Sequence, residues 1–257
     1  EVLARHRHPR VPDVRRRQLH VEIAIARMRR KSNVEAIIHP PKVPYRETIK
    51  AAVEAHGRHK KQTGGHGQFG DCEVRFEPLP PGSDFQFEND IFGGSIPRQF
   101  VPAIEKGIQD SRMRGFLAGY PMVDFKATVF DGSYHAVDSS EMAFHVAGSM
   151  AVKDAMHKAQ PYLLEPIMKV DVVMPEEYLG DVMGDLSSRR GHILGMEGRG
   201  TSQNVKANVP LSEMFGYATE LRSMTSGRAT YSMEFSHYAE MPGNLAEAVG
   251  RRTTSRS

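Results

Sequence analysis

The sequence predicts an α+β protein with two compact domains, and three observations lead to this prediction. Its 257 residues suit about two domains, at roughly 150 residues each. Hydrophobic residues make up 39% and charged residues 25%, which is ordinary for a globular chain and excludes global disorder. The clearest pattern comes near the end, where the predicted elements follow the order βαββαβ. This order is typical of the ferredoxin-like fold.

The first 42 residues are predicted to hold a basic arm and part of a domain. Residues 1–17 contain three consecutive arginines and show no apolar periodicity, so we expect a disordered arm. Residues 18–42 contain a predicted helix and a short predicted strand, and Pro40 and Pro41 end this unit. One helix and one strand cannot bury both of their faces. This segment is therefore predicted to be the remnant of a domain.

Residues 43–165 are predicted to form one domain that starts with a hairpin. Apolar residues at period two predict a strand over 43–53, and alternation of apolar and charged residues predicts a half-buried strand over 71–77. The glycine-rich turn 64–70 lies between these strands and follows the basic residues Arg58, Lys60 and Lys61. The hairpin should therefore have a long cationic tip.

The rest of this domain is predicted to alternate between strands and helices. A short strand carries Phe85 and Phe87, and a helix follows with Ser95 as its cap and Gly115 at its end. The remaining predicted elements are a strand over 123–129, a polar loop over 131–138 and a helix capped by Ser139 or Ser140 and closed by Pro161.

Residues 166–240 carry the βαββαβ pattern, with Gly191 and Gly227 where each helix should give way to a strand. The chain becomes polar after Tyr238, and residues 241–257 are predicted to be a frayed polar tail. The elements expected are strands over 169–173, 192–197, 203–209 and 229–235, with helices over 179–186 and 211–221.

Charge is distributed unevenly along the chain, and this favours a polyanionic partner such as nucleic acid. Residues 1–61 carry 16 Lys and Arg against 6 Asp and Glu, whereas the remaining residues carry 18 against 25. A solvated basic arm without a specific partner is the alternative. The longest uncharged stretch has 11 residues, so no membrane span is expected, and nothing resembles a secretion signal. We therefore expect a cytoplasmic protein.

No catalytic centre or metal site is expected. Cys72 is the only cysteine, which excludes an intrachain disulfide and a cysteine-built metal site. His56, His59 and His66 are a weak metal signal because no further ligand lies in register. The turn 64–70 precedes a strand rather than a helix and lacks the Lys-Ser/Thr pair of a phosphate-binding loop. Its glycines allow close approach to a nucleic acid, or they simply form a mobile hairpin tip.

Several long motifs resemble bacterial elongation factor G. Five segments resemble its fourth domain: Pro44-Tyr45-Arg46-Glu47-Thr48, residues 60–70, Asp90-Ile91-Phe92-Gly93-Gly94-Ser95-Ile96-Pro97, Asp131-Gly132-Ser133-Tyr134-His135 and Asp138-Ser139-Ser140-Glu141. The runs 184–191 and 210–217 resemble its fifth domain, and residues 18–38 resemble the end of its third, ferredoxin-like domain. The resemblance covers residues 18–240 in order.

This resemblance implies an S5 domain 2-like fold for the fourth domain, with a left-handed crossover, and a ferredoxin-like fold for the fifth. It implies the C-terminal part of a translational GTPase that promotes movement of transfer RNA and messenger RNA. GTP and magnesium would belong to the full-length parent, and this chain needs no cofactor and is no enzyme by itself. The expected partners are the ribosomal decoding centre, transfer RNA, messenger RNA, the stalk base and the sarcin–ricin loop, with no membrane and a monomeric chain.

The resemblance and the basic residues together predict two sets of contacts. Arg189 and Arg190 are expected to contact the large subunit. The residues expected at the RNA-binding tip are Lys60, Lys61, Gly64, Gly65, His66, Gln68, Ser133 and His135.

Three departures from the family pattern bear on function. Residues 1–17 do not match, His66 stands where the family has Arg, and Phe69 stands where it has Tyr. The last two changes weaken the charge or hydrogen-bonding capacity of the tip. A ribosome-protection or recycling paralogue without translocase activity is therefore one alternative, and a separate enzyme on the S5-like fold is another.

Overall fold

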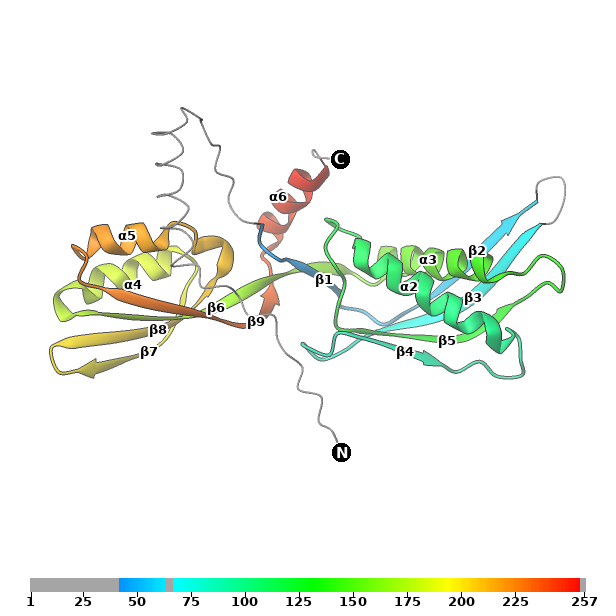
Figure 1. The fold of residues 1–257 in the computed structure, drawn as a ribbon, viewed down its shortest axis with the longest axis horizontal. Helices are drawn as coiled ribbons and strands as arrows, with labels where there is room; N and C mark the ends of the chain where they lie inside the picture. Colours follow the sequence, from blue (N-terminus) through cyan, green and yellow to red (C-terminus); the bar gives the residue numbers. More distant parts are fainter. Residues whose placement is uncertain (1–41, 63–66, 255–257) are drawn as a thin grey trace, which may run out of the picture. The chain divides into compact units, whose positions relative to one another are not determined.

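The computed structural model describes residues 42–62 and 67–254, which divide into two compact units (Figure 1). Residues 44–165 form the first unit together with the chain from 238 onward, and residues 166–237 form the second. The arm and the domain remnant predicted before residue 42 lie outside the described residues. None of the helices in the described part is long and apolar enough to cross a membrane.

The first unit contains a four-stranded sheet in the order β2-β3-β5-β4, with helices α2 and α3 on one of its faces (Figure 1). Only the β4–β5 pair is parallel, and α2 provides the crossover between these strands. The elements are β1 (Arg46–Ile49), β2 (Val53–Lys61), β3 (Gln68–Pro78), β4 (Phe85–Asn89), η1 (Arg98–Phe100), α2 (Val101–Arg114), β5 (Phe125–Ser133), α3 (Glu141–Lys158) and α6 (Gly243–Thr254).

Glycines allow α3 to lie unusually close to the sheet and to α2. A Cβ atom added at Gly57 in β2 would lie 1.9 Å from the carbonyl oxygen of Ala147 in α3. One added at Gly107 in α2 would lie 2.1 Å from the carbonyl oxygen of His145. Side chains at these positions would push the layers apart, because interiors are close-packed. The close approach forms one core, whose large side chains include Phe76, Ile104, Phe125 and Phe144.

The second unit has the four-stranded order β9-β6-β8-β7, and its elements follow the predicted βαββαβ order. β6 begins in the first unit, where its residues 161–164 pair with β1, and continues as an inner strand of the second. The elements are β6 (Pro161–Pro175), η2 (Glu176–Tyr178), α4 (Leu179–Ser188), β7 (His192–Arg199), β8 (Ser202–Pro210), η3 (Leu211–Glu213), α5 (Tyr217–Met224) and β9 (Thr230–Glu240). The ferredoxin-like prediction is confirmed.

Three local predictions in the first unit are wrong. The strand expected over 43–53 contains only β1 and the first residue of β2, because the backbone N–H groups of Lys50 and Ala51 donate to Ala159 O and the chain turns there; β2 then continues to Lys61 through residues expected in the tip. Ser95 does not cap a helix: η1 begins at Arg98, and α2 follows Phe100 without a side-chain cap. β5 continues to Ser133 through residues expected in a loop. The expected cap at Ser140 is confirmed, since its side chain accepts from Ala143 N–H.

Gly191 and Gly227 lie between a helix and a strand as predicted, and Arg190 takes the left-handed conformation after α4, with φ of 59°. Two further predictions, about the second unit and the tail, are corrected. The helix expected over 211–221 is divided by Gly216, which has φ of 79°. The tail expected to fray forms α6, whose apolar side chains pack against Ala118, Leu163 and Met241. Those side chains are Leu245, Ala246 and Val249.

Candidate nucleic-acid interface

The β2–β3 hairpin places two lysines at one end of the first unit. β2 and β3 pair from Val53–Phe76 to Lys61–Gln68, so the ladder extends to the base of the turn. Lys60, Lys61 and Gln68 are exposed there, but the long tip predicted from the sequence is wrong, because these residues pair within the ladder instead of lying in a turn. The imidazole Nε2 of His59 lies 2.9 Å from Gln68 Oε1 across the ladder. The predicted contact residues Gly64, Gly65 and His66 lie outside the described residues.

The loop after β5 is held against the start of β3 by Asp138. Phe69 N–H donates to Asp138 O at 2.8 Å, and Gly67 N–H donates to the Asp138 carboxylate at 3.0 Å. A bridge between Phe69 and Ser139 continues this contact. The loop that carries His135 and the hairpin are therefore one connected structure, as predicted from the shared tip.

The His135 ring is oriented by its own loop. Nδ1 accepts from the backbone N–H groups of Val137 at 3.3 Å and Asp138 at 3.2 Å. An imidazole nitrogen that accepts carries no proton, so the neutral ring has its proton on Nε2. The side chain is 57% exposed, and no described residue bonds to Nε2. His135 can therefore donate outward to an acceptor from a fixed position. In a doubly protonated ring, Nδ1–H would no longer accept these hydrogen bonds and would form an ion pair with Asp138 Oδ2, which lies 3.4 Å away.

Ser133 does not fit the predicted role of an outward donor. Its hydroxyl donates to Asp71 Oδ2 at 2.9 Å, so its proton is used inside the unit. Asp71 also receives His56 Nε2 at 2.5 Å and lies 3.9 Å from Arg58 Nε. This carboxylate joins β2, β3 and β5 at the base of the tip.

Asp71 and Asp138 organise the tip, yet neither was among the predicted site residues. Strand alternation predicts an exposed Asp71, but the residue is buried beneath its three partners. The sequence does contain a signal for Asp71: it is a charged residue in a strand whose neighbouring strands carry His, Arg and Ser side chains near it. For Asp138 the only signal is its position three residues after His135, in one of the motifs that resemble the family.

The ring of Phe69 lies between two cationic or polar groups. The Arg58 guanidinium carbon is 6.0 Å from its centroid, and the His135 ring is 6.5 Å away at 59°. Both distances are at the outer limit of favourable ring contacts. Phe69 thus packs within the tip without a hydroxyl to donate.

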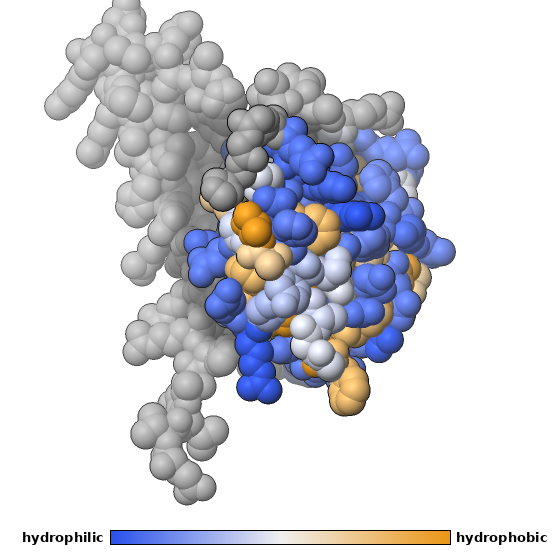
Figure 2. Space-filling model, turned by 90° about the vertical axis from the view of Figure 1, so that its right-hand side faces the viewer, coloured by the Kyte–Doolittle hydropathy of each residue, from blue (hydrophilic) through white to orange (hydrophobic). Residues whose placement is uncertain are grey.

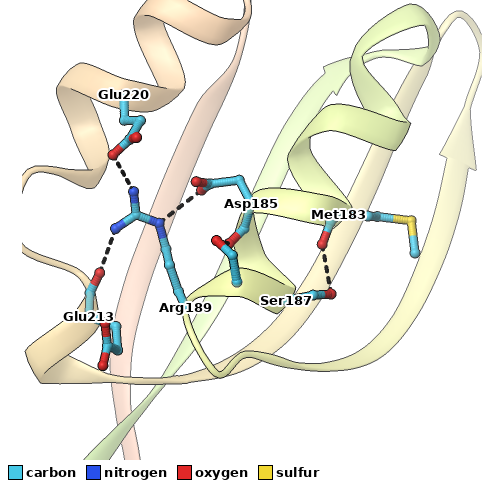
Figure 3. A network of polar contacts seen from close by, with 7 residues as sticks. Met183, Asp185, Ser187, Arg189, Glu213 and Glu220 are labelled. Carbon is cyan, nitrogen blue, oxygen red and sulfur yellow. Dashed lines mark hydrogen bonds and ion pairs between the residues drawn. The ribbon is translucent and has the colours of Figure 1, made fainter.

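Arg189, predicted to contact the large subunit, is bonded within the second unit. Its side chain is only 12% exposed, and Figure 3 shows the guanidinium enclosed by acceptors. It bonds to Asp185 Oδ2 at 2.9 Å, to Glu220 Oε2 at 2.5 Å and to Glu213 O at 2.6 Å. Arg190 is likewise engaged, 3.1 Å from Glu213 Oε1. These arginines join the end of α4 to η3 and α5.

The described residues contain no group of three or more His, Cys, Asp or Glu side chains arranged to hold a metal ion. Two of the histidines considered as ligands, His56 and His59, are instead bonded to Asp71 and Gln68. The third, His66, is outside the described residues.

Comparisons with known proteins match nearly the whole described part of the chain. The family model for elongation factor G, domain IV, matches residues 41–160, and the model for the elongation factor G C-terminus matches residues 162–249. A crystal structure of a protein from Thermus thermophilus is similar with a TM-score of 0.82 and 48% sequence identity. The similarity covers 93% of this chain and 36% of that one, so the chain spans about a third of the length of that protein.

Proposed function

Because the chain belongs to the elongation factor G family, we propose that it is the ribosome-binding C-terminal part of a translation factor that promotes movement of transfer RNA and messenger RNA. The observation that carries this proposal is the tip of the first unit. Two exposed lysines at the end of β2 and the exposed His135 ring lie there, and Asp138 bonds the His135 loop to the start of β3.

The tip suits RNA chemically because it offers donors and positive charge at one end of a rigid unit. Lysine ammonium groups bind phosphates through charge, with little dependence on sequence. A neutral imidazole N–H can donate to a phosphate, a sugar hydroxyl or a base edge. The His135 ring, held by two backbone N–H groups, loses little conformational freedom on binding. We propose that the tip acts as a wedge that opposes backward movement of the RNA.

Ribosome binding and its salt dependence test this proposal. We expect co-sedimentation with bacterial ribosomes that weakens on the order of a hundredfold between about 50 and 200 mM salt, if about five phosphates are neutralised. Replacing Lys60 and Lys61 with alanine should lower the slope of log affinity against log salt by about 1.4 to 1.8. The matched control replaces Lys153 and Lys158, near the other end of α3, and should leave the slope near that of the parent.

His135→Ala separates the donor role from the charge role. We expect a severalfold loss of affinity with an unchanged salt slope, because a neutral ring displaces no counterion. Ribosome binding that does not respond to salt, or to any of these variants, would contradict the proposal and indicate a different interface.

A further inference from the structure

Phe92 is the most exposed large apolar side chain of the described residues, at 93%. It lies in the connection between β4 and η1. Single exposed apolar side chains are common on protein surfaces and need no explanation. Phe92 differs because the residues on both sides of it in the loop are anchored to the first unit, so that only the middle of the loop extends away from the unit.

The two sides of the loop are bonded to β5 and to the core. Asp90 N–H donates to Val129 O at 2.8 Å, and the Ile96 side chain is buried in the core of the first unit. Between them, Gly93 and Gly94 both have φ of 72°, and nothing lies within 4 Å of a Cβ added at either. The left-handed glycines therefore form a turn in open space that carries Phe92 away from the body of the unit.

The topology brings this loop to the same end of the unit as the tip. β4 and β5 are parallel, with Asn89 opposite Val129, so the chain beyond each strand leaves the sheet at the same edge. Beyond Val129 the chain reaches Ser133 and His135. Ile96 returns beside Gly132, where an added Cβ would lie 2.6 Å from Ile96 Cδ1. Figure 1 shows the β4–η1 connection, the β5–α3 loop and the β2–β3 hairpin at one end of the unit.

Other exposed apolar side chains occur at this end, but they are separated by polar groups. Tyr134, Val137 and Met142 lie in or next to the His135 loop, and each is at least half exposed. Figure 2 looks onto this end and shows apolar residues scattered among hydrophilic ones rather than gathered in one patch. A protein partner would favour a continuous apolar core. An exposed ring and two exposed lysines at the same end of the unit are the combination by which surfaces bind single-stranded nucleic acid, where aromatic side chains stack on bases and cations neutralise phosphates.

We propose that Phe92 stacks on an unpaired nucleobase of the RNA that binds the tip. This inference rests on the proposed function and adds a second contact to it. The lysines of the hairpin bind the backbone, while the ring of Phe92 covers the face of a base. A base in a duplex already has both faces stacked, so the contact selects unpaired RNA. Because every base has such a face, the contact is not sequence-specific.

The chain contains no tryptophan, so Phe92→Trp would introduce a single fluorescent reporter at this position. We expect its fluorescence to be quenched by oligoadenylate and much less by a duplex of the same length. Phe235→Trp, at an exposed site in the second unit, is the matched control and should not respond. Equal quenching by single strand and duplex, or none by either, would overturn the inference.

Affinity gives an independent measurement. Phe92→Ala should weaken oligoadenylate binding about fivefold or more, which corresponds to the loss of one stacked base. Phe92→Tyr should retain binding, and Met113→Ala, which removes an exposed apolar side chain on α2, should not change it. An unchanged melting temperature would show that Phe92→Ala leaves the fold intact.

The two proposals fail differently. If the lysine variants weaken ribosome binding but Phe92→Ala has no effect on RNA binding, the stacking contact is wrong and the proposed function stands. If no variant changes ribosome binding, the proposed function is wrong. If Phe92→Ala weakens ribosome binding but not oligoadenylate binding, the partner of Phe92 is a protein and the inference is overturned.

Discussion

At the scale of single residues, Glu47 shows how a charged side chain can organise a loop from within the core. The residue is fully buried, and its carboxylate accepts four backbone N–H groups of residues 116–120 at 2.6 to 3.1 Å. Buried charge is tolerated only when it is bonded in this way. Glu47 belongs to one of the motifs that resemble the family, and its role here is structural.

Glu47→Gln should therefore destabilise the first unit by about 2 to 4 kcal/mol, because an amide replaces one accepting oxygen with a donor that faces other donors. Urea denaturation measures the loss. Glu54→Gln is the control, since Glu54 forms only an exposed ion pair with Arg75 and should change the free energy of unfolding by less than about 1 kcal/mol. Equal effects of the two variants would contradict this account of Glu47.

Cys72 is a second residue whose chemical reactivity depends on its surroundings in the fold. It lies on β3 opposite Gly57, and it is completely buried. Burial raises the pKa of the Cys72 thiol to about 12, and the neighbouring Asp71 carboxylate acts in the same direction. At pH 8 the native thiol should react with iodoacetamide at least about a thousandfold more slowly than the thiol of the denatured chain. Comparable rates would show that this part of β3 opens readily.

At the scale of elements, the end of α4 is held by backbone hydrogen bonds and by the charge of Arg189. Gly191 N–H donates to Leu186 O and Arg190 N–H to Ser187 O, which satisfies two carbonyls at the end of the helix. Arg189 then reaches across to η3 and α5 (Figure 3). Its guanidinium also lies 5.0 Å from the centre of the Tyr217 ring.

Arg189→Met should destabilise the second unit by about 3 to 5 kcal/mol, because it leaves the largely buried Asp185 carboxylate without its partner. Adding Asp185→Asn should recover much of the loss, which a double-mutant cycle in denaturant measures. Tyr217→Phe is the contrasting variant: the Tyr217 hydroxyl is buried and has no hydrogen-bond partner among the described residues, so its removal should be neutral or slightly stabilising. An additive cycle would argue against direct coupling of Arg189 and Asp185.

At the scale of the whole molecule, each unit has its own core, and the glycine-rich turn belongs to a hairpin rather than to a nucleotide-binding loop. The turn joins two antiparallel strands, so no helix N-terminus follows it to receive a phosphate. We expect this chain to show no saturable GTP binding in equilibrium dialysis with labelled nucleotide. Micromolar binding would contradict the expectation that this chain contains no nucleotide site.

Periodicity predicted most of the architecture because it reports directly on which face of an element is buried. The βαββαβ order of the second unit, the β2–β3 hairpin and the Ser140 cap all follow from spacing along the chain. The sequence also predicts that the two lysines lie at the distal end of this hairpin, although it places them in a long turn and the structure places them in β2. These features depend on interactions between residues near one another in sequence.

Tertiary structure decided the features that depend on partners far apart in sequence. Arg189 and Ser133 look like surface donors in the sequence, but Glu220, Glu213 and Asp71 bind them inside the fold. The tail forms α6 because its apolar side chains meet buried residues of the first unit, which no local pattern contains. The contact of the His135 loop with β3 through Asp138 and the contact of Ile96 with Gly132 arise in the same way. The role of a charged or apolar side chain depends on the residue that it contacts, and that contact exists only in the folded chain.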